Sequence, residues 1–295
     1  MILFVSGRTD IIAFYSEWFY RRYQEGFVDV RNPFYPKNVS RINFYDVDAI
    51  VFCTKNPIPI IKYIDKIDKP LLFHITLTPY KKDIEPNVPD KKDIIEAIKK
   101  LANVLGKDRI YIRYDPVFLS DKYTVDYHIK AFNRMCSLLN GYTEHIIISF
   151  LDVYKNVLKN RKVLNYREIN DEDYKKIGYA FSESARNNGM TVQTCFEEHD
   201  LIEYGFIKSD CMPISLAYFL TGKTKFKKWN ARKEKKCNCV EMVDIGVYNT
   251  CQHFCKYCYA NYDEKQVINN CGHHDKNSSL LIGTLQDDDI IKIRT

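Results

Sequence analysis

Short apolar runs alternate with amphipathic stretches of helical period over the first two hundred residues. This alternation is typical of successive βα units around a parallel sheet. The predicted strands are Ile2–Ser6, Ala49–Cys53, Leu71–Leu77, Arg109–Tyr114, His145–Phe150 and Met190–Cys195. The predicted helices are Ile11–Gln24, Ile58–Ile67, Lys91–Leu105, Val125–Leu139, Asp171–Asn188 and Pro213–Leu220. We therefore predict an α/β fold, a partial (β/α)6 TIM-like barrel over residues 1–222 with a C-terminal cysteine-rich, cluster-binding segment.

The other segments depart from this alternation. Phe27–Arg31 and Ser40–Phe44 predict a small β excursion after the first helix. Residues 152–170 lack periodicity and predict a long loop, which in a compact domain is usually a lid or disordered. Beyond the barrel we predict a basic linker at 223–236, an iron–sulfur segment at 237–262 that packs on the barrel mouth, and a polar tail at 263–295.

Polar side chains gather where the predicted strands end. In a (β/α) barrel the C-terminal strand ends carry the active site, so we expect a ligand-sized pocket there. We assign catalytic roles to Arg8, Asp10, Lys55, Arg113 and Asp115. The alternative for the last two is an ion pair that closes the barrel rim. We also expect cofactor-binding roles for Asn56, Glu197 and Glu198, although the two glutamates are equally compatible with a charged loop.

Composition indicates a folded chain. Of its 295 residues, 45% are hydrophobic and 28% are charged, unlike the profile of disordered chains. Its apolar runs are shorter than the roughly 18–20 residues of a membrane span, and the opening run predicts a strand rather than a signal peptide. We therefore expect a cytoplasmic protein without a membrane partner.

The net charge of +6 owes much to the lysine- and arginine-rich segment 223–236. A local basic patch of this kind permits contact with nucleic acid or another phosphate-bearing partner. A solvated linker is the alternative.

Ten cysteines without an export signal favour metal or redox chemistry over a disulfide framework. Cys53 and Cys136 alone precede residue 190, and we interpret both as buried small hydrophobic residues. The others crowd the last third of the chain, which indicates a shared metal site. Cys271 lies beside two histidines in the predicted tail, where we expect a flexible segment.

The strongest motif is Cys251-x3-Cys255-x2-Cys258, with Tyr257 directly before the last cysteine. Three thiolates on one short loop suit a [4Fe–4S] cluster, and a missing fourth protein ligand leaves one iron open to another molecule. A structural zinc site would instead require four ligands. Within this motif we interpret His253 as a solvent-exposed spacer, the alternative being a hydrogen bond to the cofactor.

This spacing, with its aromatic residue, resembles the signature of the radical S-adenosylmethionine superfamily. The resemblance implies that Cys251, Cys255 and Cys258 hold a [4Fe–4S] cluster that cleaves S-adenosylmethionine to a 5′-deoxyadenosyl radical. It also implies that Tyr257 packs near the adenine of S-adenosylmethionine. The superfamily carries this loop after its first strand, whereas here it follows all six units. We expect the linker at 223–236 to return the loop to the barrel mouth.

Nearly the whole chain also resembles a bacterial and archaeal family of domains of unknown function. The blocks that carry this resemblance are Ser6–Asp10, Val30–Phe34, Thr54–Pro57, Glu85–Pro89, Arg113–Pro116, Asp244–Cys251 and Tyr259–Asn261. This second resemblance supports the barrel and the cluster and implies no substrate.

Four further cysteines, Cys195, Cys211, Cys237 and Cys239, precede the main motif. Four thiolates are sufficient for an auxiliary iron–sulfur cluster or a structural zinc ion. The third alternative is that they bind no metal.

The residues therefore predict a radical S-adenosylmethionine enzyme whose substrate is open, with nucleic acid or a nucleotide permitted by the basic segment. Its electron donor would be a protein such as a flavodoxin or ferredoxin. The main alternative is a zinc-stabilised barrel protein that binds a phosphate-bearing partner. An electron-transfer iron–sulfur protein is a third alternative, but it would not require the polar strand ends.

Overall fold

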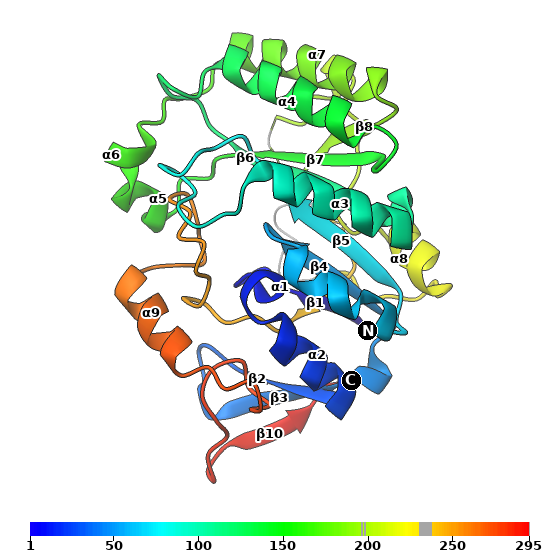
Figure 1. The fold of residues 1–295 in the computed structure, drawn as a ribbon, viewed down its shortest axis with the longest axis vertical. Coiled ribbons are helices and arrows are strands. Elements are labelled where there is room, and N and C mark those ends of the chain that lie inside the picture. The colour runs from blue at the N-terminus through cyan, green and yellow to red at the C-terminus, as the bar shows by residue number, and fades with distance from the viewer. Residues whose placement is uncertain (196, 198, 230–237, 295) are drawn as a thin grey trace.

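Seven parallel strands form the central sheet in the order β8-β7-β6-β5-β4-β1-β9 (Figure 1). The computed structural model describes residues 1–195, 197, 199–229 and 238–294. The strands are β1 (Ile2–Val5), β4 (Ala49–Thr54), β5 (Leu71–Thr76), β6 (Ile110–Val117), β7 (His145–Phe150), β8 (Thr191–Thr194) and β9 (Met242–Asp244). The six predicted strands are all present, and β9 is an additional one. The α/β fold is confirmed, but in the described residues β8 and β9 are the two edges of an open sheet.

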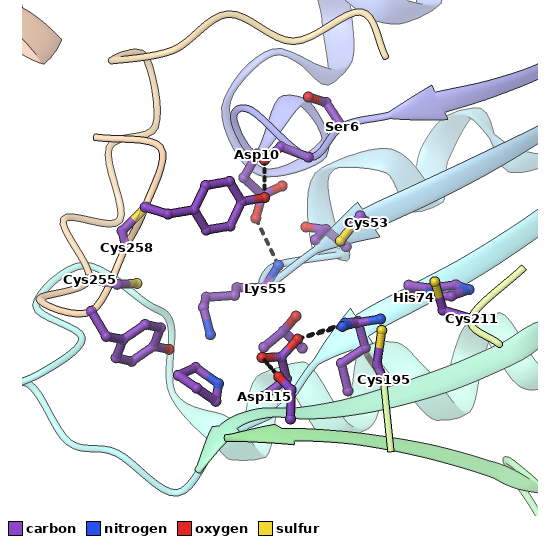
Figure 2. Close-up of a pocket in the computed structure, with 18 of the residues that line it drawn as sticks. Ser6, Asp10, Cys53, Lys55, His74, Asp115, Cys195, Cys211, Cys255 and Cys258 are labelled. Atoms are coloured by element: carbon purple, nitrogen blue, oxygen red, sulfur yellow. Dashed lines mark hydrogen bonds and ion pairs between the residues drawn. The ribbon is translucent and has the colours of Figure 1, made fainter. Parts of the chain in front are cut away.

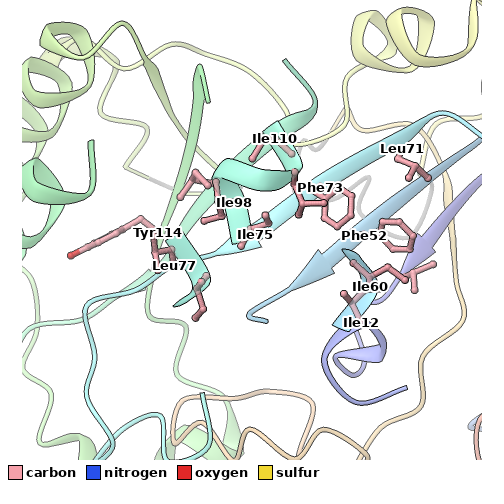
Figure 3. Close-up of a cluster of buried hydrophobic side chains, with 14 of the residues drawn as sticks. Ile12, Phe52, Ile60, Leu71, Phe73, Ile75, Leu77, Ile98, Ile110 and Tyr114 are labelled. Carbon is pink, nitrogen blue, oxygen red and sulfur yellow. The ribbon is translucent and has the colours of Figure 1, made fainter. Parts of the chain in front are cut away.

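Helices cover one face of this sheet. They are α1 (Ile11–Phe14), α2 (Ser16–Glu25), the 3₁₀ helix η2 (Ile58–Lys66), α3 (Lys91–Leu105), α4 (Val125–Leu139) and α7 (Asp171–Asn187). Phe52 and Phe73 point toward these helices, and Figure 3 shows Ile98 of α3 in the same cluster. Their neighbours Val51 and Leu72 pack on the opposite face because successive side chains of a strand alternate. The apolar strands thus contribute side chains to two separate hydrophobic cores, one on each face of the sheet.

The second core is covered by α8 (Ile214–Thr221) and by the segment that leads into β9. Leu216 and Leu220 of α8 pack with Val51, Leu72 and Met242. This helix and the segment before β9 thus cover the face of the sheet opposite α3 and α4.

A smaller sheet has the order β10-β3-β2, from β2 (Phe27–Arg31), β3 (Asn38–Asn43) and β10 (Ile290–Ile293). The segment 263–295 was predicted to be a polar tail, yet it contains α9 (Glu264–Gly272) and β10. Its anchors are specific: Trp18 Nε1 donates to the Ser278 carbonyl over 2.9 Å, and Leu280 and Leu281 are buried.

The prediction of a loop at 152–170 was wrong, because the structure has two short helices there, α5 (Lys155–Lys159) and α6 (Arg161–Leu164). Each buries one apolar residue, Val157 and Leu164 respectively, so no hydrophobic period could develop. The remaining short 3₁₀ helices are η1 (Phe44–Asp46), η3 (Lys107–Arg109) and η4 (Ile202–Tyr204). Among the described residues, no helix has the length and apolar character needed to cross a membrane.

Candidate active site

A cavity of about 400 Å³ opens at the C-terminal ends of the parallel strands. Figure 2 shows Cys255 and Cys258 at one end of it, Cys195, Cys211 and His74 at the other, and Lys55 and Asp115 between them. The predicted catalytic residues Asp10, Lys55, Arg113 and Asp115 all line it, as do Tyr257 and Glu197. The strand ends and the late cysteine loop, far apart in sequence, therefore share one chamber.

Cys251, Cys255 and Cys258 form one wall of the cavity. The chain reverses between the first two at Phe254, whose φ of 55° is in the left-handed region, and the backbone N–H of Ala260 donates to Cys258 Sγ over 3.3 Å. Burial raises the pKa of all three thiols above the ordinary value. At neutral pH all three are therefore protonated thiols.

His253 links the cysteine loop to the first strand end. The interpretation of His253 as an exposed spacer was wrong, because the side chain is buried and its Nε2 lies 2.9 Å from Asp10 Oδ2. Asp10 also accepts the Lys55 backbone N–H over 2.7 Å and caps α1 through the Ala13 N–H over 3.0 Å. One carboxylate therefore joins the loop, the first helix and the end of β4.

Two other segments clasp the loop through its backbone. Lys256 N–H donates to the Ile84 carbonyl over 2.9 Å, and the Asn87 side chain donates to the Gln252 carbonyl over 2.8 Å. From the opposite side, Asn160 donates to the Lys256 carbonyl over 2.7 Å. The segment 152–170, predicted as a long loop, is thus part of the support of the cysteine loop.

Glu85 is the centre of a buried charge network beneath the loop. It pairs with Lys55 over 2.9 Å and with Lys91, and it accepts hydrogen bonds from Thr78 over 2.6 Å and from Tyr257. Burial alone would raise the pKa of Glu85, but the charges of Lys55 and Lys91 outweigh it and lower the pKa to about 2. Glu85 therefore remains a carboxylate and fixes both Tyr257 and the Lys55 ammonium at the cavity wall.

Arg113 and Asp115 form the ion pair considered above, 2.6 Å from Nη2 to Oδ2, while both line the cavity. Arg113 Nε also donates to Asp115, over 3.0 Å, and Ser149 donates a third hydrogen bond to this carboxylate. Burial would raise the pKa of Asp115, but Arg113 and Ser149 lower it below its usual value. The pair presents a fixed positive and negative group to any ligand in the cavity.

Glu197 reaches the same chamber and accepts the Phe150 backbone N–H over 2.9 Å. Burial raises the pKa of Glu197 to about 8, with the nearby Asp152 and Asp115 adding to the effect. At neutral pH it is therefore mostly a neutral acid and a hydrogen-bond donor. Its neighbour Glu198 lies outside the described residues.

Arg8 and Asn56 have other contacts. Arg8 Nη2 donates to the Asp244 carbonyl over 2.8 Å, which ties the end of β1 to β9. The Asn56 side-chain Oδ1 accepts the Ile58 N–H over 3.2 Å at the start of η2. Both residues thus stabilise the rim of the cavity, and neither belongs to its described lining.

A second group of thiols lies at the far end of the cavity. Cys211 Sγ is 3.4 Å from Cys239 Sγ, and Cys195 lines the cavity beside Cys211. The fourth predicted member, Cys237, lies outside the described residues. In the described part of the chain, no group of three or more His, Cys, Asp or Glu side chains is arranged to bind a metal ion.

The remaining cysteines differ in surroundings. Cys136 is buried in the core, as predicted, whereas Cys53 lines the cavity. Cys271 lies on α9, with Sγ 3.1 Å from the Tyr15 hydroxyl, so the expectation of a flexible segment was wrong. Every described cysteine is a free thiol.

A family model described as "Domain of unknown function (DUF1848)" matches residues 2–260. The chain belongs to the DUF1848 family. A search of curated proteins found no match. The DUF1848 match ends just after Cys258 and contains every described residue that lines the cavity. The site is therefore part of the family domain, whereas α9 and β10 lie beyond the match.

Sequence reasoning missed the role of Glu85. Its block, Glu85–Pro89, was noticed as part of a family resemblance, but a lone glutamate between strand and helix carries no signal of complete burial. Thr9, one of the polar residues that follow the first predicted strand, lines the cavity, and its buried hydroxyl has no partner in the described residues. Such an orphaned hydroxyl is the kind of group a ligand satisfies.

Proposed function

We propose that this DUF1848 protein is a radical S-adenosylmethionine enzyme with a [4Fe–4S] cluster on Cys251, Cys255 and Cys258. The observation that carries the proposal is the shared cavity. The three thiols of a C-x3-C-x2-C loop face the polar ends of parallel strands, although the loop follows those strands in sequence.

The three thiols fit a cluster in several respects. They are buried, they line one wall, and Cys258 Sγ already accepts a backbone N–H, a type of contact that tunes cluster potential. They are not gathered around one point, and a cubane does not require this, because each thiolate binds a different iron. When bound, the cluster would supply the electron that cleaves S-adenosylmethionine to a 5′-deoxyadenosyl radical.

The seven-stranded sheet supports the same proposal if it is interpreted as the partial barrel of that superfamily. Its strands follow one another in space as β1, β4, β5, β6, β7 and β8. The cavity volume of about 400 Å³ falls within the range of roughly 300–1,000 Å³ found for small-ligand sites. A chamber of this size suits a nucleoside-like cofactor beside a compact substrate group.

The cavity residues then have distinct tasks. The Lys55 ammonium and the Arg113 guanidinium would bind carboxylate or phosphate groups. Protonated Glu197 would donate a hydrogen bond at the opposite wall, and Asp115 would hold Arg113 in place. Tyr257, fixed by Glu85, would pack against the cofactor's adenine.

The direct test is turnover. Anaerobically reconstituted protein, reduced with dithionite and supplied with S-adenosylmethionine, is expected to form 5′-deoxyadenosine and methionine, and the Cys136→Ala variant should do the same. No 5′-deoxyadenosine from a protein that has been shown to bind a cluster would contradict the proposal. A protein that binds zinc on these cysteines and no iron would support the zinc-stabilised binding protein instead.

A further inference from the structure

Cys195, Cys211 and Cys239 lie in the same region of the structure, although they belong to three separate segments of the chain. Cys195 directly follows β8, Cys211 precedes α8, and Cys239 precedes β9. Cys211 Sγ lies 3.4 Å from Cys239 Sγ, and Cys195 lines the same end of the cavity as Cys211. All three remain free thiols rather than disulfides. The fold therefore brings three soft ligands together without cross-linking them.

Backbone contacts hold these thiols in place. Asn238 N–H donates to Asp210 Oδ1 over 3.0 Å, and Val240 N–H donates to the Met212 carbonyl over 3.0 Å. These two links flank Cys211 and Cys239 on both sides. Gln193 Nε2 also donates to the Asp210 carbonyl over 3.2 Å, which ties the pair to β8 and Cys195. Hydrogen bonds thus hold the three segments together next to the sulfur atoms.

An unpartnered ligand-type atom lies at the same end of the cavity. His74 is only 4% exposed, lines the cavity with Cys195 and Cys211, and its buried Nε2 has no hydrogen-bond partner in the described residues. Figure 2 shows His74 and Cys211 together at this end. A neutral imidazole nitrogen and thiolates are the ligands that zinc and iron–sulfur clusters use.

We propose that Cys195, Cys211 and Cys239, with His74 beside them, hold a second, thiolate-bound metal centre of zinc or iron–sulfur type at the inner end of the cavity. Metal binding would require Cys195 and His74 to move toward the Cys211–Cys239 pair, since no three of these groups are yet arranged around one point in the described residues. Thiolates at about 2.3 Å from a tetrahedral zinc ion lie roughly 3.8 Å apart, compared with 3.4 Å for Cys211 and Cys239 as thiols. Metal binding would replace the thiol protons and release them to solvent.

The test uses a full-length Cys251→Ala/Cys255→Ala/Cys258→Ala variant, so that metal at the loop cannot contribute. After anaerobic purification or reconstitution with Zn²⁺ or with iron and sulfide, it is expected to retain about one zinc ion, or about two to four iron atoms with sulfide, per chain. Adding Cys195→Ala, Cys211→Ala and Cys239→Ala should abolish this content. Adding Cys53→Ala, a cysteine of the same cavity, should leave it unchanged.

Cobalt gives an independent measurement in case the six-fold variant fails to fold. Co²⁺ added to the loop-deficient protein should produce thiolate-to-cobalt charge-transfer absorption, which the single change Cys211→Ser should weaken while circular dichroism stays the same. A folded loop-deficient protein that binds none of these metals would overturn the inference, as would metal content indifferent to Cys195, Cys211 and Cys239. This result does not depend on the proposed radical reaction, since the tested protein lacks the three loop cysteines.

Discussion

The two thiol groups of the cavity are built in opposite ways. Cys251, Cys255 and Cys258 belong to one eight-residue stretch, outside any helix or strand, that lies over the strand ends. Cys195, Cys211 and Cys239 come from three segments joined by backbone hydrogen bonds. The loop group has its ligands close in sequence but depends on outside side chains for its position. The inner group forms only when the chain is folded, because its cysteines belong to segments that are far apart in sequence.

Because of this difference, different substitutions should disturb each group. Asp10, Glu85, Asn87 and Asn160 hold the loop from three parts of the chain. Changes in these anchors should disturb the loop centre and spare the inner one. The following predictions use that separation, beginning with the largest effect.

Replacing all three loop cysteines with alanine should reduce 5′-deoxyadenosine formation to background. Iron analysis should show loss of the loop cluster only, because no backbone link of the inner group involves the loop. Loss of metal from both groups in a folded protein would mean that they form one interdependent unit.

Glu85→Gln should lower the free energy of unfolding by about 3–5 kcal/mol, since it leaves two lysines buried beside a neutral amide. The wild-type carboxylate, with its pKa of about 2 instead of 4.5, contributes stability above pH 4.5 that is lost as the pH falls toward 2. Denaturant unfolding across this window should show a steeper loss of stability in the wild type than in the variant, in which only the other paired carboxylates still titrate.

The exposed Glu264, paired with Lys256 over 2.7 Å, is the matched control for Glu85. Glu264→Gln should change the free energy of unfolding by less than about 1 kcal/mol. An equal loss for both variants would show that the buried network does not hold the loop.

Asp115→Asn should leave both metal contents intact and slow 5′-deoxyadenosine formation about tenfold to hundredfold, because Arg113 and Ser149 lose their shared anchor. Initial rates at saturating S-adenosylmethionine measure this effect. The surface change Asp83→Asn serves as control, and equal rates for the two variants would remove Asp115 from the active site.

His253→Phe keeps a ring against Phe14, now at a centroid distance of 4.6 Å, and removes the hydrogen bond to Asp10. A lost bond of about 1.5 kcal/mol corresponds to roughly a tenfold faster loss of loop iron to a chelator. The inner metal should leave at the wild-type rate. Unchanged loss from the loop would indicate that the other anchors suffice.

The sequence predicted the regular elements well where burial and caps are local. The strands of the main sheet are buried on both faces and appear as continuous apolar runs. The bounds of α3 and α4 were predicted correctly, since Asp90 and Thr124 cap them through their side chains. The short strand β9 has three residues and no periodicity, so only its pairing with β1 reveals it.

The candidate site was predictable to the extent that its chemistry is contiguous. The cysteine loop and the charged strand ends carry local signals, and the rule that parallel strands end at one edge brought them together. The links Asp10–His253 and Glu85–Tyr257 join residues more than 150 positions apart. Such contacts depend on tertiary packing, which no local pattern of residues encodes.

The most direct test of the central claim is electron paramagnetic resonance of anaerobically purified, dithionite-reduced protein before and after addition of S-adenosylmethionine, with iron and sulfide measured on the same sample. The account predicts a [4Fe–4S] signal that changes when S-adenosylmethionine is added and that disappears in the Cys258→Ala variant. Zinc without iron after anaerobic reconstitution, or a cluster signal indifferent to S-adenosylmethionine, would contradict it.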